Sequence, residues 1–330
     1  MKRKLYRAAI IGAGRIAAQY DSPQDRRVLT HAHAIRLNRS VRGLGFYDKN
    51  FESARKAGHK WKLRPFRSLD EMLRDSPEIV VVAVPDESHF DVLKTVLDYS
   101  PRVVMCEKPL ATSFAKSLEI DRMFRKKGVL LTVNYQRRYD SSVFKLRREI
   151  ARGRYGRPLS GVVYYSKGIL HNGSHAMDLL RFLFGEAESL LVSERLNDYR
   201  KDDPTVGGIV FFDGFSVHLV AGNQKYVSLF EIDLIFEKAR FRFVDSGFSL
   251  EQYGVVKDPV FQGFRRFGNL HRRKTELRKS LSDMWAETIA YLDAGELPRT
   301  ASTEILGGQY LCEALVKAPL NRLRVLTGYR

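Results

Sequence analysis

An apolar strand near the start of the chain runs directly into a glycine-rich turn, and this arrangement restricts the possible folds most. The segment reads Ala8-Ala9-Ile10-Ile11-Gly12-Ala13-Gly14-Arg15-Ile16-Ala17. A Gly-x-Gly-x-x-Ala turn between a strand and a helix is typical of dinucleotide-binding units. There the first glycine allows a tight turn, the second lets the backbone approach a pyrophosphate, and the alanine packs the helix on the sheet. We therefore predict that the cofactor-binding residues of this turn are Gly12, Gly14, Arg15, Ile16 and Ala17.

A carboxylate follows the second predicted strand, where such units bind a ribose. Gly43–Tyr47 leads into Asp48, which lies 34 residues beyond the second glycine of the turn instead of the usual ~20. The polar segment Asp21–Arg27 accounts for the excess as a loop insertion. Because a carboxylate binds the ribose diol and repels a 2′-phosphate, Asp48 favours NAD, while the nearby cations Lys49 and Arg15 leave NADP as an alternative. An ordinary turn residue is the other interpretation of Asp48.

Strand and helix patterns alternate over the first part of the chain. Ile79–Val84 is a continuous apolar strand, as expected when both faces of a sheet are buried. A helix is predicted over Ser113–Lys127 with Gly128 as its C-cap, followed by a strand over Val129–Asn134. This alternation predicts a doubly wound parallel sheet of the Rossmann type.

A short polar motif follows the strand Val103–Cys106. It reads Cys106-Glu107-Lys108-Pro109-Leu110. Open α/β sheets bind ligands at the carboxyl ends of their strands, so Glu107 and Lys108 are placed where chemistry is expected. A half-buried lysine can hydrogen-bond a reacting oxygen or take part in proton transfer.

The second part of the chain changes to mostly strand patterns. An amphipathic helix is predicted over Ser141–Arg152. The predicted strands then cover residues 160–167, 189–196, 208–213, 215–220, 226–236 and 239–243, and helices return over 281–294 and 302–316. Period-two alternation in the strands predicts a large, open, mostly antiparallel sheet in a C-terminal α/β domain. With 330 residues and 44% apolar content, we expect two domains, residues 1–125 and 126–330.

Two histidines and an aspartate cluster at the start of a helix predicted to begin near Ser174. His175 and Asp178 lie three positions apart on one face, and His171 and Asn172 lie in the preceding turn. An imidazole accepts a hydroxyl proton near neutral pH, and a nearby carboxylate can fix its tautomer. A capped helix start with ordinary polar residues is the alternative. His171 and His175 have the spacing of metal ligands, but no third ligand is evident, so we predict no metal site.

The composition limits the classes of partner. Two cysteines are too few for a disulfide framework, and no apolar run is long enough to span a membrane, so we expect a cytoplasmic protein. The net charge of +18 is spread along the chain, with one dense basic run at Arg265–Lys279. That run fits a solvated helix or mobile loop, or an anion funnel for a charged substrate. No nucleic-acid-binding signature accompanies it, so we expect no nucleic-acid partner.

Taken together, these motifs resemble the Gfo/Idh/MocA family of NAD(P)-dependent oxidoreductases. The resemblance rests on six markers in order, Gly12-Ala-Gly14-Arg-Ile-Ala17, Val84-Pro85 with His89, Cys106-Glu107-Lys108-Pro109-Leu110, Asn134-Tyr-Gln-Arg-Arg138-Tyr139, Gly153-Arg-Tyr-Gly156 and Gly173-Ser-His175-Ala-Met-Asp178. It implies an NAD(P)-binding Rossmann domain and a second domain that binds substrate and mediates oligomers. A homodimer or homotetramer formed through the open sheet is the implied assembly.

The resemblance also assigns roles to residues. Lys108 and His175 match the family's catalytic lysine and histidine, and Pro85, His89, Glu107 and Lys108 join the glycine turn and Asp48 as cofactor-binding residues. The candidate substrate contacts lie near strand ends or on the histidine helix and are Tyr135, Arg138, Lys167, Asn172 and Asp178. The implied reaction moves a hydride between nicotinamide and the carbinol or carbonyl carbon of a sugar, nucleotide-sugar or cyclitol. The basic charge balance favours an anionic substrate.

One position departs from the family pattern. Members usually carry an aspartate four residues before the catalytic histidine, and that position here is His171, or Asn172 if one gap is allowed. Either alignment lacks the carboxylate. His171 then takes over the proton relay, or the chain has lost turnover. The alternative function is a non-catalytic, NAD(P)-binding, sugar-sensing regulatory protein.

Overall fold

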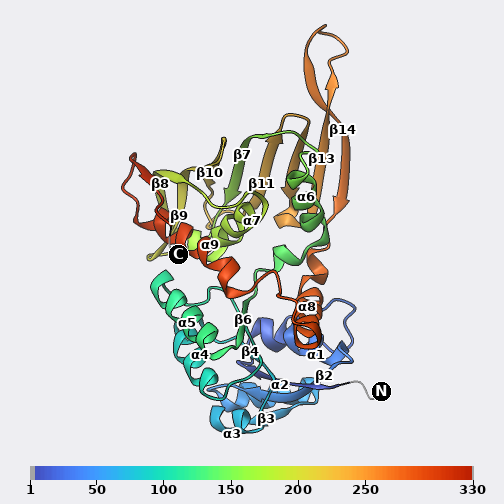
Figure 1. Ribbon diagram of the computed structural model, residues 1–330, viewed down its shortest axis with the longest axis vertical. Helices are drawn as coiled ribbons and strands as arrows, with labels where there is room; N and C mark the ends of the chain where they lie inside the picture. The colour runs from blue at the N-terminus through green and yellow to red at the C-terminus, as the bar shows by residue number, and fades with distance from the viewer. Residues whose placement is uncertain (1–3, 329–330) are drawn as a thin grey trace. The chain divides into compact units, whose positions relative to one another are not determined.

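The computed structural model describes residues 4–328 and divides into two compact units (Figure 1). The first unit comprises the residues up to Tyr139 together with Arg278–Leu306. The second comprises Asp140–Leu277 and the residues from Gly307 onward. Among residues 4–328, no helix combines the length and apolar character that crossing a bilayer requires.

The first unit is built on a six-stranded sheet in the order β3-β2-β1-β4-β5-β6, with every neighbouring pair parallel. Its strands are β1 (Tyr6–Ile11), β2 (Val41–Tyr47), β3 (Arg64–Phe66), β4 (Ile79–Val82), β5 (Val103–Cys106) and β6 (Leu130–Val133). All residues of β4, β5 and β6 are buried, as expected for strands covered on both faces. The predicted doubly wound parallel sheet is confirmed.

The first unit also contains helices, most of which connect these strands. They are the short turns η1 (Arg15–Gln19), η2 (Asp86–Ser88) and η3 (Gln136–Tyr139), and α1 (His31–Leu37), α2 (Phe51–Trp61), α3 (Leu69–Arg74), α4 (His89–Asp98), α5 (Phe114–Lys127) and α8 (Ser280–Ala294). Helix α5 is capped by the Ser113 side chain and ends at Gly128, whose φ of 68° suits glycine. The predicted boundaries of this helix hold because both of its caps are visible in the sequence.

The helix predicted to follow the glycine turn is only the five-residue π-helical turn η1. An irregular loop then leads to α1, as the predicted insertion requires. Buried Asp21 holds this loop, because its carboxylate accepts hydrogen bonds from the Leu29 and Thr30 amides and from the Thr30 hydroxyl, and contacts His33 Nδ1 at 2.8 Å. The inserted loop is therefore anchored from inside.

A C-terminal segment completes the first unit. Met284, Trp285 and Leu292 of α8 belong to the same buried cluster as Ile10 of β1 and Ala32 of α1. This differs from the predicted division between residues 125 and 126, because β6 lies in the first sheet and residues 278–306 return to the first unit. Local sequence patterns do not reveal that a distant helix packs back on the first sheet.

The second unit contains a nine-stranded sheet in the order β14-β13-β12-β11-β7-β10-β9-β8-β15. Its strands are β7 (Pro158–Tyr165), β8 (Ser189–Arg200), β9 (Asp203–Phe212), β10 (Phe215–Ala221), β11 (Phe230–Phe236), β12 (Ala239–Val244), β13 (Ser249–Lys257), β14 (Arg265–Lys274) and β15 (Leu323–Val325). Only the β7–β10 pair is parallel among the strand pairs of these described residues. The predicted large, mostly antiparallel sheet is confirmed.

One face of this sheet carries the core of the unit. Alternate residues of β11, among them Ile232 and Leu234, are buried in a cluster with side chains of α6 (Ser141–Ala151), α7 (Ser174–Phe184) and α9 (Ser302–Lys317). The turns η4 (Gly168–Gly173), η5 (Asp245–Gly247) and η6 (Leu277–Lys279) join the remaining elements. The division between the two units falls within α9.

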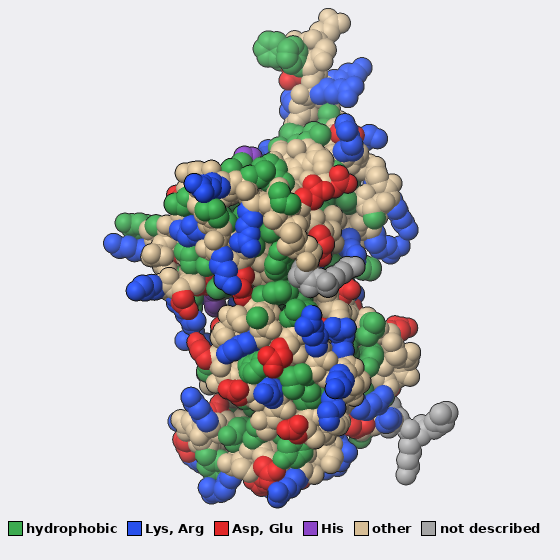
Figure 2. Space-filling view, turned by 60° about the vertical axis from the view of Figure 1, so that its left-hand side comes forward, with side chains coloured by type: hydrophobic (Ala, Val, Ile, Leu, Met, Phe, Trp, Pro, Cys, Tyr) green, Lys and Arg blue, Asp and Glu red, His purple; other side chains and the backbone are tan. Residues whose placement is uncertain are grey.

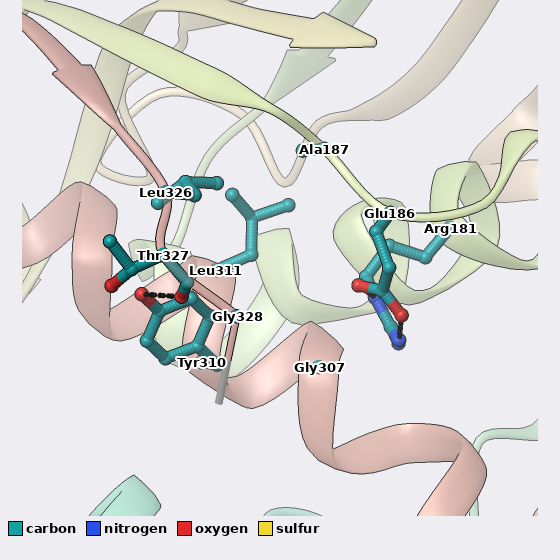
Figure 3. A pocket seen from close by; sticks show the side chains of 9 residues that line it. All are labelled: Arg181, Glu186, Ala187, Gly307, Tyr310, Leu311, Leu326, Thr327 and Gly328. Carbon is teal, nitrogen blue, oxygen red and sulfur yellow. Dashed lines mark hydrogen bonds and ion pairs between the residues drawn. The ribbon is translucent and has the colours of Figure 1, made fainter. Parts of the chain in front are cut away.

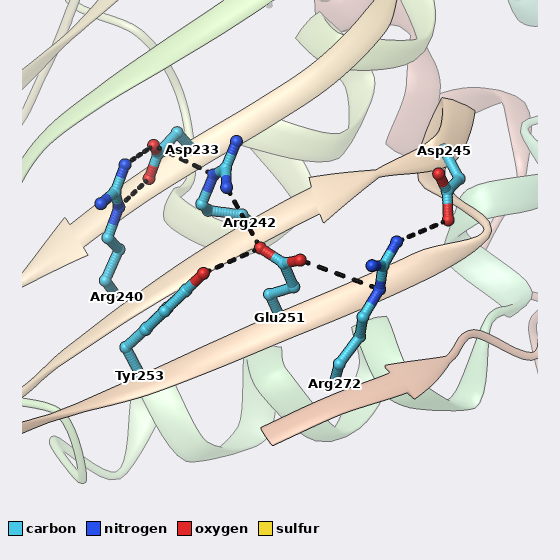
Figure 4. Close-up of polar contacts among 7 residues, drawn as sticks. All are labelled: Asp233, Arg240, Arg242, Asp245, Glu251, Tyr253 and Arg272. Carbon is cyan, nitrogen blue, oxygen red and sulfur yellow. Dashed lines mark hydrogen bonds and ion pairs between the residues drawn. The ribbon is translucent and has the colours of Figure 1, made fainter. Parts of the chain in front are cut away.

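The other face carries a ladder of ion pairs across β11, β12, β13 and β14 (Figure 4). Arg240 Nε lies 2.9 Å from the Asp233 carboxylate, and the Arg242 guanidinium contacts both Asp233 and Glu251 at 3.6 and 3.2 Å. Arg272 continues the ladder with Glu251 at 3.8 Å and binds a further carboxylate at the end of β12. Several cations of the basic chain are therefore neutralised on the sheet itself.

The basic run Arg265–Lys279 is mostly strand. It forms β14 and η6, so the solvated helix or mobile loop that we predicted is wrong. β14 is an edge strand of the sheet, where cations discourage edge-to-edge pairing. The β13–β14 hairpin extends beyond the rest of its sheet in Figure 1, and Figure 2 shows hydrophobic side chains at its end with Lys and Arg beneath. Its tip exposes Val260, Phe261 and Phe264.

Two phenylalanines of the second unit test where its stability resides. Phe241 is fully buried between aromatic rings, whereas Phe264 is 69% exposed. We expect Phe241→Ala to lower the free energy of unfolding by about 3–5 kcal/mol and Phe264→Ala by under ~0.5 kcal/mol. Thermal unfolding followed by near-UV circular dichroism measures both. Equal effects of the two substitutions would contradict this packing.

Candidate functional site

The glycine turn in the first unit requires glycine at its first position for reasons internal to the protein. Gly12 has a φ of +96°, and a Cβ there would lie 2.2 Å from the carbonyl oxygen of Ala83. Its amide donates to the Tyr47 carbonyl at 2.7 Å. The backbones that follow β1, β2 and β4 thus meet at the point where the strand order reverses, which is where open α/β sheets bind ligands.

Gly14 differs from Gly12, because contacts within the described residues do not account for a glycine at this position. Its φ of −76° is open to any residue, and within residues 4–328 no heavy atom beyond its two chain neighbours lies within 4 Å of the position that a Cβ would occupy. Ala17 is fully buried, as the helix-packing position of the motif requires. Open space beside Gly14 fits the pyrophosphate of a dinucleotide, while Arg15 and Ile16 begin the turn that follows.

Asp48 lies beside the glycine turn, as predicted. One of its carboxylate oxygens accepts the Ala13 amide hydrogen at 2.8 Å, and the other accepts that of Asn50 at 2.9 Å. The carboxylate therefore braces the turn against the end of β2. Each oxygen retains a second lone pair, so a ribose diol can still be bound.

The Glu-Lys-Pro motif follows β5, and Lys108-Pro109 is a cis peptide. Buried His89 places Nδ1 2.7 Å from the Pro109 carbonyl and Nε2 3.0 Å from the Val84 carbonyl. Both ring nitrogens of this predicted cofactor residue thus face backbone. His89 ties the motif to the loop after β4, where Pro85 begins the turn η2.

Glu107 is held by side chains from two other elements. Its Oε1 lies 3.0 Å from His31 Nε2 of α1 and accepts Asn134 Nδ2 at 2.6 Å. Burial raises the pKa of Glu107, but the hydrogen bonds from His31 and Asn134 and the neighbouring Lys108 charge outweigh it, so the pKa is lowered and the carboxylate is ionised. Sequence analysis missed His31 because nothing local links it to residue 107.

In the second unit, the predicted histidine cluster lies in η4 and the first turns of α7. The amides of Leu170 and His171 donate to the buried Asp203 carboxylate at 2.7 and 2.9 Å. The His171 ring lies 5.0 Å from that of Tyr199, and Lys167 Nζ lies 5.4 Å from the same ring. The structure therefore groups Lys167 and His171 around Tyr199, which sequence analysis missed because it lies in a remote strand.

The other predicted residues of this unit lie close by in the chain. His175 is half-buried in the first turn of α7, which begins at Ser174 as predicted, and Asp178 is buried one turn later. The Asn172 amide group donates to the Ser166 and Leu229 carbonyls at 2.9 and 3.0 Å. The Asn172 side-chain amide nitrogen therefore donates to two backbone carbonyls and stabilises the turn.

Two predicted substrate contacts are buried in the first unit. Tyr135 and Arg138 are each 3% exposed. The Arg138 guanidinium donates to the carbonyls of Arg299 and Glu304, both at 3.1 Å. These bonds anchor the returning C-terminal segment, so the Arg138 guanidinium has a structural role and is not part of the proposed substrate site.

A small pocket in the second unit contains none of the predicted site residues (Figure 3). It measures about 60 Å³, and its wall includes Tyr310, whose hydroxyl donates to the Thr327 carbonyl, and the Arg181–Glu186 ion pair. Within residues 4–328 the structure also shows no group of three or more His, Cys, Asp or Glu side chains able to hold a metal ion.

Residues 6–135 match a family model described as an oxidoreductase family with an NAD-binding Rossmann fold. The glycine turn and the Glu-Lys-Pro motif both fall within the matched segment. Residues 6–135 belong to the Gfo/Idh/MocA oxidoreductase family.

Individual relatives agree with this assignment. An inositol 2-dehydrogenase of Mycolicibacterium gilvum is 35% identical over 130 residues, which cover 36% of this chain and 37% of that protein. The match thus spans little more than a third of the relative's length.

Two solved structures share the fold over nearly the whole chain. A putative NADPH-dependent oxidoreductase from Desulfitobacterium hafniense has a TM-score of 0.80 at 17% identity, covering 97% of both chains. A super-repressor mutant of Gal80p from Saccharomyces cerevisiae has a TM-score of 0.75 at 14% identity, covering 94% of this chain and 95% of that one. At such identities the likeness establishes the fold only.

The two turn glycines make a paired test of cofactor binding. Gly14→Val fills open space, so we expect NAD affinity to fall by about two orders of magnitude or more while the melting temperature stays near wild type. Gly12→Ala clashes with backbone and should cost on the order of 2–4 kcal/mol of stability. NADH fluorescence titration and thermal unfolding separate the two outcomes. Retained affinity in Gly14→Val would remove Gly14 from the site.

Asp48 generates a second test. Because its carboxylate repels a 2′-phosphate, we expect NAD to bind more tightly than NADP, and Asp48→Asn to narrow the difference by roughly tenfold. Titration of wild type and variant with NADH and NADPH measures this. A clear preference of the wild type for NADPH would overturn the assignment of Asp48.

Proposed function

We propose that the protein is an NAD-dependent oxidoreductase that transfers a hydride between nicotinamide and a carbinol or carbonyl carbon of a sugar, nucleotide-sugar or cyclitol. The observation that carries the proposal is the open space beside Gly14 in a segment of the NAD-binding family. The relative named as an inositol 2-dehydrogenase supports the polyol class. NADP remains the alternative cofactor.

The residues present fit a nicotinamide dinucleotide. The glycine turn would hold the pyrophosphate, Asp48 the ribose, and the segment Glu107–Lys108 lies at the carboxyl end of β5 in the same sheet. When bound, the nicotinamide ring supplies or accepts the hydride. The protein's own residues bind and orient the partners and move the proton.

Two side chains are proposed to act on the reacting oxygen. Lys108 hydrogen-bonds the developing alkoxide or the carbonyl oxygen and stabilises its charge. His175 takes or returns the hydroxyl proton. Both roles come from the family positions that these residues match. His171 is proposed as the relay in place of the missing aspartate, with its backbone fixed by Asp203.

The remaining assignments extend this proposal. Tyr135, Lys167 and Asp178 are proposed around the substrate, with an anionic sugar as the favoured class because of the +18 net charge. The local ion pairs of the large sheet weaken that last argument, since they neutralise part of the charge. A homodimer or homotetramer is the proposed assembly.

A non-catalytic, sugar-sensing regulator is the second candidate. It is favoured by the missing carboxylate before His175. A panel of sugars, cyclitols and sugar acids, scanned for NADH absorbance changes, separates the two. Turnover supports the dehydrogenase, whereas tight ligand binding without turnover supports the sensor.

The proposed chemistry predicts kinetic losses. Lys108→Ala and His175→Ala should each lower kcat by about two to four orders of magnitude, the usual scale for a positioned acid–base group. The Kd for NADH should change little. Stopped-flow and steady-state kinetics measure these effects, with Lys116→Ala, at an exposed position of α5, as the control. Full activity in Lys108→Ala would refute the mechanism.

His171 gives a separate prediction. If it relays the proton, His171→Ala should lower kcat by at least about tenfold and remove one limb of the pH–rate profile. His171→Ala with wild-type kinetics and an unchanged profile would show that it is only a turn residue.

A further inference from the structure

A chain of buried polar side chains runs through the first unit and ends beside Lys108. Trp285 Nε1 of α8 donates to His31 Nδ1 of α1 at 3.2 Å. The other ring nitrogen of His31 lies 3.0 Å from Glu107 Oε1, and Asn134 Nδ2 donates to the same oxygen at 2.6 Å. Helix α1 and the residue after β6 therefore bind one carboxylate directly, and α8 supports it through His31.

The direction of these bonds fixes the state of His31. An indole nitrogen only donates, so His31 Nδ1 must accept and cannot carry a proton. The hydrogen of His31 is then on Nε2, which donates to Glu107. His31 is thus a neutral imidazole of defined tautomer and is 1% exposed. The hydrogen bonds at Oε1 favour the carboxylate form of Glu107 over its protonated form.

The ionised Glu107 carboxylate influences the charge state of the next residue in the sequence, Lys108. The Lys108 charge favours the ionised form of Glu107, so by reciprocity the Glu107 charge favours the ammonium form of Lys108. An ammonium is a hydrogen-bond donor and cannot serve as a base. The hydrogen bonds that favour the Glu107 carboxylate therefore also favour Lys108 as a hydrogen-bond donor over Lys108 as a base.

We propose that His31 and Trp285 are positioning residues that fix the Glu107 side chain as a carboxylate one residue before Lys108, so that Lys108 meets the substrate oxygen as an ammonium donor. The inference rests on the proposed function, because only a reacting oxygen gives Lys108 that task. It assigns proton exchange to another group and leaves Lys108 to stabilise charge.

Glu107→Gln is the sharpest variant. The Gln amide oxygen still accepts from both His31 and Asn134, so the shape and the bonds persist while the negative charge is lost. Amine labelling of Lys108 by trinitrobenzenesulfonate at about pH 8, quantified by mass spectrometry on the full-length protein, reports the fraction of neutral amine. Labelling should rise about tenfold, because an ammonium deprotonates more readily without the neighbouring carboxylate.

His31 variants test the positioning step. His31→Leu removes both of its bonds and should raise Lys108 labelling in the same direction, while His31→Gln, which can accept from Trp285 and donate to Glu107, should restore it. His33→Gln is the matched control, because His33 is equally buried on α1 but contacts Asp21 instead. It should leave Lys108 labelling unchanged. Melting temperatures establish that each labelled variant is folded.

The outcomes separate this inference from the proposed function. Unchanged labelling in Glu107→Gln, or an equal rise in His33→Gln, would overturn the inference even if the protein is an active dehydrogenase. Raised labelling in Glu107→Gln and His31→Leu with rescue by His31→Gln supports it even if no polyol is turned over. Once a substrate is found, Glu107→Gln should lower kcat about tenfold or more at nearly unchanged NADH affinity.

Discussion

The close approach of Gly12 to the Ala83 carbonyl is the constraint on which the first unit depends. At that point the backbones leaving β1 and β4 are so near that no side chain fits between them. The Gly12 amide binds the Tyr47 carbonyl on the other side, so the ends of the three central strands are locked together. The space beside Gly14 is open and lies at the switch point, where open α/β sheets bind ligands.

The second constraint is electrostatic. The first unit partly buries the Glu107 carboxylate and satisfies it with donors from α1 and from the residue after β6. Helix α8 reaches this cluster through Trp285, although it comes from the end of the chain. The return of the C-terminal segment therefore both completes the hydrophobic core and fixes the polar groups next to Lys108. This explains why the first unit is not a continuous stretch of sequence.

The sequence predicts those parts of the molecule whose causes are local. The glycine turn, the cap of α5 at Gly128, the strand before Glu107 and the start of α7 near Ser174 all have signals within a few residues. The contacts of His31 with Glu107 and of His171 with Tyr199 have no local signal, because both depend on strands and helices brought together by folding. The prediction for the basic run Arg265–Lys279 was wrong for a related reason. Its pairing with β13, which makes it a strand, has no signal within the run itself.

The structure of the protein bound to NADH tests the central claim most directly. The account predicts that the pyrophosphate occupies the open space at Gly14, that the adenosine ribose binds Asp48, and that the nicotinamide ring lies next to Lys108. A pyrophosphate bound elsewhere, or a nicotinamide ring remote from Lys108, would contradict it.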